Sequence, residues 1–167
     1  AYTGTLSVVA ARAGASAVVS VDLSSGVLNW ARDNFRLSGL DPFDRRYEFA
    51  ASDASRFLAE AAAAGRRFVL VLADPRAFSA ARGAAFTIDR DYPALVAAAA
   101  RVLSPGGLLW LACNARETSL LDIAQEGLRE ARREAVLLET GGLPPDHPTL
   151  LAQPEDRSLQ VGLFRPE

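Results

Sequence analysis

Short apolar runs alternate with helical segments along most of the chain, and this alternation restricts the fold more than any other feature. The runs at 17–22, 67–73 and 108–113 are largely apolar, as expected for strands that are buried on both faces. Segments with apolar residues at helical spacing separate them. This order predicts an α/β fold in which a mostly parallel sheet carries helices on both faces.

Boundary signals place the individual elements. Three expected helices are followed by glycines typical of C-caps, at Gly14, Gly39 and Gly65. We expect residues 76–86 to form a loop and Ser-Pro-Gly-Gly at 104–107 to form a turn. The last two strands are expected to pair as an antiparallel hairpin at the sheet edge. The full set comprises helices at 4–13, 25–38, 54–64, 89–103 and 118–133, and strands at 17–22, 47–51, 67–73, 108–113, 135–140 and 158–164.

The composition is that of one soluble globular domain, 1–167, with 50% hydrophobic and 23% charged residues. The net charge of −2 argues against strong nucleic-acid binding by this segment alone, because neutralising phosphates needs a clustered positive surface. No apolar run approaches the roughly 18 residues that span a bilayer, and a single cysteine, Cys113, excludes an internal disulfide. These features predict a cytoplasmic protein with no membrane partner. No Cys or His spacing suggests a metal site.

Four strand ends carry distinctive residues, and ligands of open α/β sheets bind beyond the carboxyl ends of the strands. Ala-Tyr-Thr-Gly at 1–4 precedes a helix, so its glycine permits close backbone approach and the helix N-terminus offers free N–H groups. Asp22 ends a strand, where a carboxylate can accept hydrogen bonds from both hydroxyls of a ribose. Asp53-Ala54 follows the next strand, placed to meet an adenine edge, and Asp74-Pro75 ends the most apolar strand.

Each acid also has a purely structural interpretation. Asp22 precedes Ser24 and Ser25 and can belong to a helix cap, and Asp53 can be the N-cap of the helix that follows it. Asp74-Pro75 can be a simple turn. The joint placement of these acids at successive strand ends favours binding, because capping does not require it.

Four segments resemble the methyltransferase domain of the large-subunit (23S) ribosomal RNA methyltransferases, a family with cytosine-C5 and guanine-N7 members. They are AYTGTLSVVAARAGA from residue 1, VVSVDLSSGVLNWARDNFRLSGL from 18, ADPRAF from 73, and the stretch from RDYPAL at 90 to LSPGGLLWLACNAR ending at 116. PDHP at 145–148 with PE at 154–155 is also similar to the cytosine-C5 branch. The resemblance covers nearly the whole chain and implies a Rossmann-like methyltransferase fold.

The resemblance also implies a cofactor, a substrate and site residues. The implied cofactor is S-adenosylmethionine (SAM), and the implied substrate is a base of ribosomal RNA, so the implied activity is rRNA methylation. Asp74, Pro75 and Asn114 would lie near the methyl group and the target base. Asp74 would also contact the cofactor. The full set of residues implied to contact it is Tyr2, Thr3, Gly4, Asp22, Leu23, Asp53, Ala54 and Asp74.

The catalytic half departs from the family pattern. Arg76 stands where the family usually has a second proline, and Phe78 is either a stacking partner for a base or a core residue. Counted from Gly106-Gly107, Asn114 rather than Cys113 falls on the position of the nucleophilic cysteine of cytosine-C5 enzymes. A one-residue offset in a strand turns a side chain to the opposite face, so Cys113 is expected to be a small core residue.

The stretch from Asn114 to Arg116 is closer to the guanine-N7 branch, in which no covalent intermediate is needed. His147 lies in a proline-rich loop, as a surface residue or as a base near the site. A lone histidine favours the surface interpretation.

The chain has no methionine, even at position 1, and starts inside the glycine loop. In this fold the strand before that loop is the central one. We therefore expect an N-terminally truncated domain that lacks its first central strand and whose RNA is recruited mainly by the missing N-terminal region. Unpaired backbone groups beside the missing strand predict weak or absent SAM binding by this segment alone.

Three functions are weighed. The leading one is a SAM-dependent methyltransferase acting on a base of 23S rRNA, and the alternative is a degenerate domain that keeps the fold but has lost catalysis, motivated by Arg76 and Asn114. A nicotinamide-dependent oxidoreductase is disfavoured because residues 1–14 hold only Gly4 and Gly14 and lack the GxGxxG fingerprint. Nothing in the sequence predicts the oligomeric state.

Overall fold

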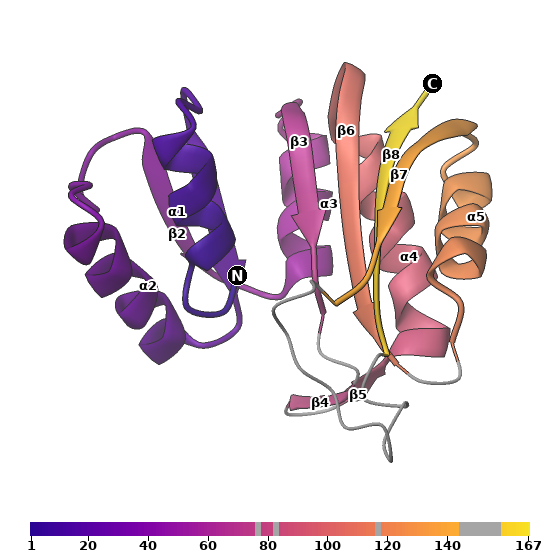
Figure 1. Cartoon of the computed structure of the whole chain (residues 1–167), viewed down its shortest axis with the longest axis horizontal. Coiled ribbons are helices and arrows are strands. Elements are labelled where there is room, and N and C mark those ends of the chain that lie inside the picture. The colour runs from indigo at the N-terminus through magenta and orange to yellow at the C-terminus, as the bar shows by residue number, and fades with distance from the viewer. Residues whose placement is uncertain (76–77, 82–83, 116–117, 144–157) are drawn as a thin grey trace. The chain divides into compact units, whose positions relative to one another are not determined.

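The computed structural model describes residues 1–75, 78–81, 84–115, 118–143 and 158–167. These residues form two compact units, Ala1–Glu60 and Ala61–Glu167, and the division falls inside helix α3 (Ala54–Ala63). Figure 1 shows the order of the elements along the chain. Hydrogen bonding divides the described strands into three separate sheets. In the described part of the chain, no helix is long and apolar enough to cross a membrane.

The first unit is built on two parallel strands with two helices packed against them. Because Val18 pairs with Tyr47 and Asp22 pairs with Ala51, both strands end at the same edge. The elements are α1 (Thr5–Arg12), β1 (Val18–Asp22), α2 (Ser25–Leu37) and β2 (Tyr47–Ala51).

Aromatic rings form the core of the first unit. The Phe35 ring of α2 is fully buried and meets Tyr47 and Phe49 of β2 edge-on, at centroid distances of 5.0 and 5.1 Å. Ala11 of α1 completes the buried cluster. Ser24 caps the start of α2, because its side chain accepts a hydrogen bond from the Val27 N–H, and this cap fixes the helix directly after β1.

The second unit contains a four-stranded sheet in the order β3-β6-β8-β7. β3 and β6 run parallel, whereas β8 lies between β6 and β7 and is antiparallel to both. Together with the parallel pair in the first unit, this confirms the predicted α/β class and the antiparallel C-terminal pair. The bounds are β3 (Phe68–Ala73), β6 (Leu103–Asn114), β7 (Ala135–Gly141) and β8 (Leu159–Pro166).

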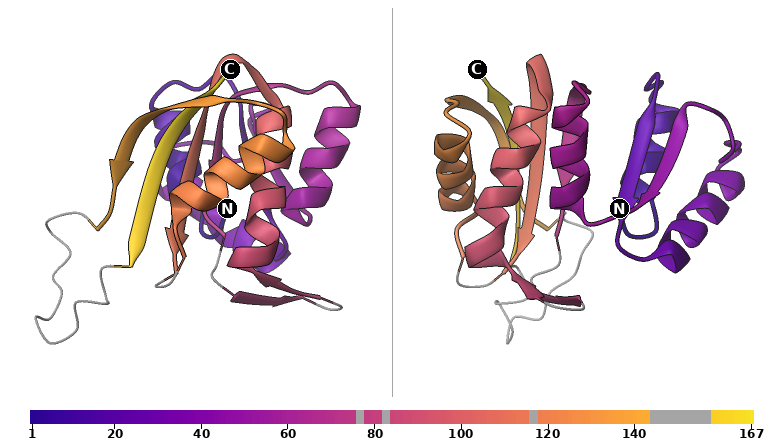
Figure 2. Two further views of the ribbon diagram at one scale, coloured as in Figure 1. Left: turned by 90° about the vertical axis from the view of Figure 1, so that its right-hand side faces the viewer. Right: turned by 180° about the vertical axis from the view of Figure 1, so that it is seen from behind.

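Helices α4 (Ile88–Arg101) and α5 (Leu120–Glu130) pack side by side against this sheet, as the turned views in Figure 2 show. A Cβ added to Gly127 of α5 would lie 2.5 Å from the Pro93 carbonyl oxygen and 2.6 Å from the Val96 Cβ. The helices therefore touch at a position where only hydrogen fits.

Two predictions from the sequence are wrong. The segment predicted as a loop at 76–86 contains an antiparallel pair, β4 (Phe78–Ala81) and β5 (Ala84–Thr87). Its alanine-rich strands have little β propensity, so pairing across the hairpin decides their conformation. The turn predicted at 104–107 lies inside the bounds of β6, where the register with β3 shifts between Phe68 and Leu70, so the extra residues form an irregularity within one strand.

Candidate functional site

The loop at 1–4 is held against the carboxyl end of β1 by Asp22. The Tyr2 N–H donates to Asp22 Oδ2 at 2.9 Å, and the Ala1 nitrogen lies 3.2 Å from the same oxygen. Asp22 Oδ1 accepts the Ser24 N–H at 3.0 Å. One carboxylate therefore joins the loop, the end of β1 and the start of α2, so the structure brings together the first two predicted cofactor positions.

The charge state of Asp22 follows from these contacts. Partial burial alone would raise the pKa of Asp22, but the hydrogen bonds from the Ser24 and Tyr2 N–H groups lower it, and the pKa lies below its ordinary value. The side chain keeps 24% of its surface exposed. Asp22 is thus an ionised, reachable acceptor at the strand end.

Gly4 starts α1 in a left-handed conformation with φ +79°, which disfavours any side chain. A Cβ there would also lie 2.8 Å from the Cβ of Ala31 on α2. The loop can therefore approach α2 only through glycine.

Two anchors of this loop are missing from the sequence-based prediction. Asn34 Nδ2 donates to the Thr3 carbonyl oxygen at 2.8 Å, and Ser20 Oγ of β1 donates to Ser7 Oγ of α1 at 2.8 Å. The first contact fixes the loop on α2, and the second fixes α1, which follows the loop, on β1. No local signal could have found them, because 31 residues separate Asn34 from Thr3.

The predicted adenine position lies at the same edge, after β2. Asp53 Oδ1 accepts the Arg56 N–H at 3.0 Å, so Asp53 does cap α3. The Ser52 N–H donates to the Asp22 carbonyl oxygen at 3.0 Å, which places Asp53-Ala54 directly beside the end of β1. Leu23, next to Asp22, exposes 55% of its surface. Asp53 therefore caps α3 and also lies beside Asp22.

In the second unit, Asp74 and Pro75 follow β3 as predicted, and the side chain of Asp74 is exposed. Neighbouring atoms still desolvate it enough to raise the pKa of Asp74. The fully buried Tyr92 of α4 lies behind it, with its hydroxyl 2.8 Å from the Ala73 carbonyl oxygen and 2.9 Å from that of Ala112. The hydroxyl lies between these two carbonyls, so Tyr92 links the last residue of β3 to β6 two residues before β6 ends.

Cys113 and Asn114 end β6 and differ sharply in exposure. Cys113 is fully buried, and this burial raises the pKa of its thiol. Asn114 is exposed, and its Oδ1 accepts a hydrogen bond from Ser158 Oγ. The neutral, enclosed thiol fits a core residue, as expected from the register.

Gln160 of β8 anchors the chain after β6. Its Nε2 donates to the Thr118 carbonyl oxygen at 2.6 Å, and its Oε1 accepts the Leu120 N–H at 3.0 Å. Thr118 Oγ1 in turn donates to Asp89 Oδ1 of α4 at 2.6 Å. These contacts, also absent from the sequence-based prediction, hold the start of α5 beside the end of the sheet.

Several predicted residues lie outside the described residues: Arg76, Arg116, His147 and the PDHP and PE stretches, along with the side chain of Phe78. Within the described residues, no group of three His, Cys, Asp or Glu side chains is placed to hold a metal ion.

The sequence profile of the S-adenosylmethionine-dependent methyltransferase family matches residues 1–164. The chain belongs to this family. The SAM-dependent methyltransferases share S-adenosylmethionine as cofactor, which agrees with the prediction, and the match runs through both units.

Curated relatives of this SAM-dependent methyltransferase are much longer than the chain. It is 36% identical over 149 residues to the ribosomal RNA large subunit methyltransferase K/L of Shewanella amazonensis, covering 88% of the chain and 20% of that protein. It is 36% identical over 127 residues to methyltransferase K of Neisseria meningitidis, covering 75% and 35%. It is 35% identical over 157 residues to methyltransferase I of Aeromonas hydrophila, covering 92% and 39%.

Solved structures of methyltransferases share the fold. One complexed with SAH matches with a TM-score of 0.85 at 22% identity, over 98% of this chain and 42% of that one. A SAM-dependent methyltransferase from Agrobacterium tumefaciens matches with a TM-score of 0.76 at 24% identity, over 99% and 54%. These similarities establish the Rossmann-like methyltransferase fold.

Proposed function

We propose that this chain is the catalytic domain of an enzyme that transfers a methyl group from SAM to a base of large-subunit ribosomal RNA. The observation that carries the proposal is the hydrogen bond between Asp22 and the loop at 1–4. It brings a carboxylate and the N-terminus of α1, which begins after Gly4, together at the same edge of the sheet. Relatives that are named for rRNA methylation support the substrate class.

The first unit fits the cofactor by the chemistry of its groups. Asp22 is an ionised, partly exposed acceptor, which suits two ribose hydroxyls. Tyr2, Thr3 and Gly4 would present backbone at the start of α1, and Gly4 leaves no side chain in the way. Leu23 offers exposed apolar surface, and Asp53-Ala54 lies beside it at the adenine position. When bound, SAM supplies a methyl group on a positively charged sulfur.

The second unit supplies the groups for the base. Asp74 and Pro75 at the end of β3, and Asn114 at the end of β6, would hold the base edge by hydrogen bonds and shape, which orients its reacting atom. Tyr92 is a positioning residue here, because its hydroxyl fixes the carbonyls directly before Asp74 and Cys113.

We infer that no covalent bond forms between the enzyme and the base. The buried Cys113 thiol has a raised pKa and so is poorly suited to attack a ring carbon. A guanine N7 already carries a lone pair and would accept the methyl group directly, with the sulfur keeping the electron pair of the bond that breaks, so no enzyme nucleophile would be needed. Guanine is therefore the proposed target base.

We further propose that RNA is recruited mainly by a region outside residues 1–167, N-terminal to this chain. The net charge of −2 and the greater length of the relatives support this division of labour. Such an enzyme would act in the cytoplasm, where ribosomes assemble.

The test is to incubate the full-length protein that contains this chain with labelled SAM and unmodified rRNA and to map the product. Methyl at guanine N7, unchanged in a Cys113→Ala variant, is the expected result. Methyl at cytosine C5 that is lost in the variant would overturn the non-covalent mechanism. Bound SAM without any transfer would instead favour a degenerate domain.

A further inference from the structure

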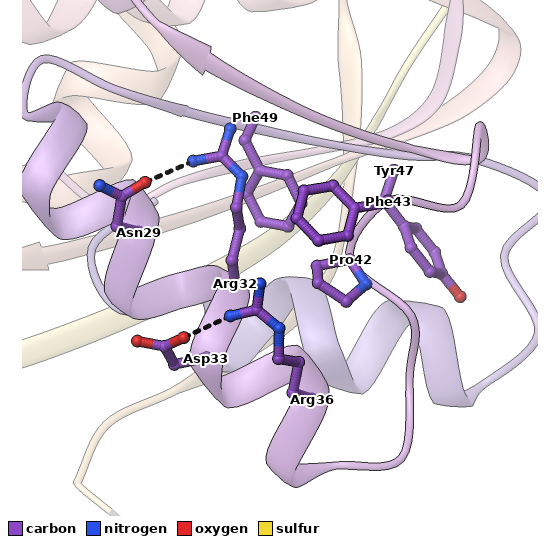
Figure 3. Close-up of a pocket in the computed structure, with 8 residues that line it drawn as sticks. All are labelled: Asn29, Arg32, Asp33, Arg36, Pro42, Phe43, Tyr47 and Phe49. Carbon is purple, nitrogen blue, oxygen red and sulfur yellow. Dashed lines mark hydrogen bonds and ion pairs between the residues drawn. The ribbon is translucent and has the colours of Figure 1, made fainter.

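A hollow in the first unit lies away from the predicted cofactor edge. It has a volume of about 630 Å³ and is shown in Figure 3. One face of α2 forms one wall, and the other comes from the loop before β2 together with the amino end and middle of that strand. Asp22 and Ser52 lie at the opposite, carboxyl end of the strands. The lining residues are Asn29, Arg32, Asp33, Arg36, Pro42, Phe43, Tyr47 and Phe49.

Two arginines of α2 lie over aromatic rings in this hollow. The Arg32 guanidinium carbon is 4.7 Å from the Phe49 ring centroid, and that of Arg36 is 5.4 Å from the Phe43 centroid. Asp33, the acid that lines the hollow, is paired with Arg36. Arg32 is hydrogen bonded to the neutral Asn29, and no described carboxylate lies within ion-pair distance of it. Among the described residues that line the hollow, Arg32 is therefore a cation without a carboxylate partner, and it lies on an aromatic ring.

Phe43 contributes little to the hydrophobic core, because 74% of its surface is exposed. Its loop is nevertheless ordered. The Phe43 N–H donates to Asp41 Oδ1 at 3.0 Å, and the Tyr47 N–H donates to the Asp44 carbonyl oxygen at 2.9 Å. Pro42 beside it is buried. The ring is thus held in solvent by a fixed backbone, with one face toward Arg36.

We propose that this hollow binds a nucleotide of single-stranded RNA, with a base stacked on Phe43 and a neighbouring phosphate held by Arg32 and Arg36. The proposal rests on the proposed function for its choice of RNA. An exposed ring accepts any base by stacking, and guanidinium groups that lie on rings keep their edge N–H donors for phosphate oxygens. A duplex keeps its bases stacked inside the helix, so it cannot use Phe43 in this way.

The test measures binding of a fluorescent single-stranded RNA to the protein by anisotropy, at several salt concentrations. Phe43→Ala should weaken binding about tenfold, whereas Phe43→Trp should preserve it. Arg32→Ala should weaken binding and lower the slope of log affinity against log salt by about 0.7. Trp30→Ala removes an exposed aromatic of α2 outside the hollow, and Arg56→Ala removes an exposed arginine of α3. Neither control should change the affinity.

The same protein preparations are assayed for methyl transfer to rRNA, so the two proposals fail separately. Wild-type affinity in Phe43→Ala and Arg32→Ala, alongside normal methyl transfer, would overturn the role of the hollow and leave the proposed function standing. Binding that is sensitive to Phe43, in a protein that methylates no rRNA, would support the hollow and overturn the proposed function. Equal competition by a duplex of the same sequence would also overturn the proposal.

Discussion

Asp22 shows how one side chain can hold its surroundings together and still offer acceptor capacity to a ligand. Both carboxylate oxygens accept backbone N–H groups, from Tyr2 and Ser24, and the side chain still reaches solvent. A carboxylate has about four lone-pair positions, so acceptor capacity remains for a ligand. The cap and the ribose contact that the sequence leaves as alternatives are therefore compatible.

Replacing Asp22 by alanine should weaken SAM binding by about tenfold or more, because two charge-assisted hydrogen bonds to the ribose would be lost. Isothermal titration with S-adenosylhomocysteine measures the change. Glu60→Ala, which removes an exposed acid of α3 that pairs with Arg56, is the matched control and should bind as the unaltered protein does. Equal affinity in both variants would remove Asp22 from the cofactor site.

Replacing Asp74 by asparagine should abolish methyl transfer and slightly stabilise the fold at pH 7. Desolvation raises the pKa of Asp74, so its ionised form is disfavoured in the folded state and costs stability above that pKa. The gain in the variant should shrink as the pH falls toward the unfolded value of about 3.9 and disappear about one unit below it, where both states are protonated. Thermal unfolding at several pH values measures it.

Asp91→Asn is the control, and its effect on stability at pH 7 should be opposite in sign to that of Asp74→Asn. Hydrogen bonds from Arg90 and Thr87 lower the pKa of Asp91, so its ionised form stabilises the fold at pH 7 and that contribution is lost as the pH falls through the folded pKa. This variant should unfold at a lower temperature than the unaltered protein at pH 7. A lower unfolding temperature in Asp74→Asn as well would contradict the interpretation of Asp74.

Residue types at strand ends could be predicted from the sequence, but their supports could not. Asp22 and Asp74 each directly follow an apolar run, which is a local signal. Asn34, Tyr92 and Gln160 act on partners about 20 to 40 residues away, and such pairs exist only once the fold brings them together. The role proposed for the exposed Phe43 was likewise not predicted, because the residues around it in the sequence do not indicate that its backbone is held in place.

At the scale of elements, the strong apolar patterns of β1 and β3 predicted those strands within a residue or two, and the weaker pattern of β2 was also sufficient. The β4–β5 hairpin was missed because alanine and serine carry little strand signal. The irregular start of β6 was missed for a different reason. Pro-Gly-Gly is typical of a turn, and here the chain absorbs it within a strand by shifting register against β3.

Replacing Gly127 by alanine should destabilise the protein by about 1–3 kcal/mol, because the added methyl group would overlap Pro93 and Val96 on α4. Urea unfolding measures the loss. Gly26→Ala in α2 is the matched control, since a Cβ there meets nothing closer than Ser24 Oγ at 3.7 Å. It should be neutral or stabilise by up to about 1 kcal/mol. Equal effects of the two changes would argue against close contact of α4 and α5.

At the scale of the whole molecule, the candidate residues are divided between the two compact units. Asp22, the glycine loop and Asp53 belong to Ala1–Glu60, whereas Asp74 and Asn114 belong to Ala61–Glu167. Apart from Asp74, the predicted cofactor residues belong to the first unit, and the residues proposed to hold the base belong to the second. Cofactor binding should consequently protect the backbone amides of the first unit more than those of the second.

Hydrogen exchange with and without S-adenosylhomocysteine should show this difference. We expect the strongest added protection at residues 2–5, 22–25 and 52–54, because these segments form the predicted cofactor edge. At a ligand concentration of about 100 Kd, amides that exchange only from the unbound state should slow about a hundredfold. Protection confined to the second unit would contradict the assignment of the cofactor to the first.

The contact between Gly4 and Ala31 has a consequence for how this sequence can vary. Position 31 belongs to a helix core and not to the predicted ligand edge, yet its side chain sets the room available to the glycine loop. A change to valine would push the loop rather than merely crowd the core. In a mutational survey such a substitution would register as a loss of cofactor binding. If the loop binds the cofactor as proposed, variation at this helix position would be limited by a ligand-binding loop on another segment of the chain.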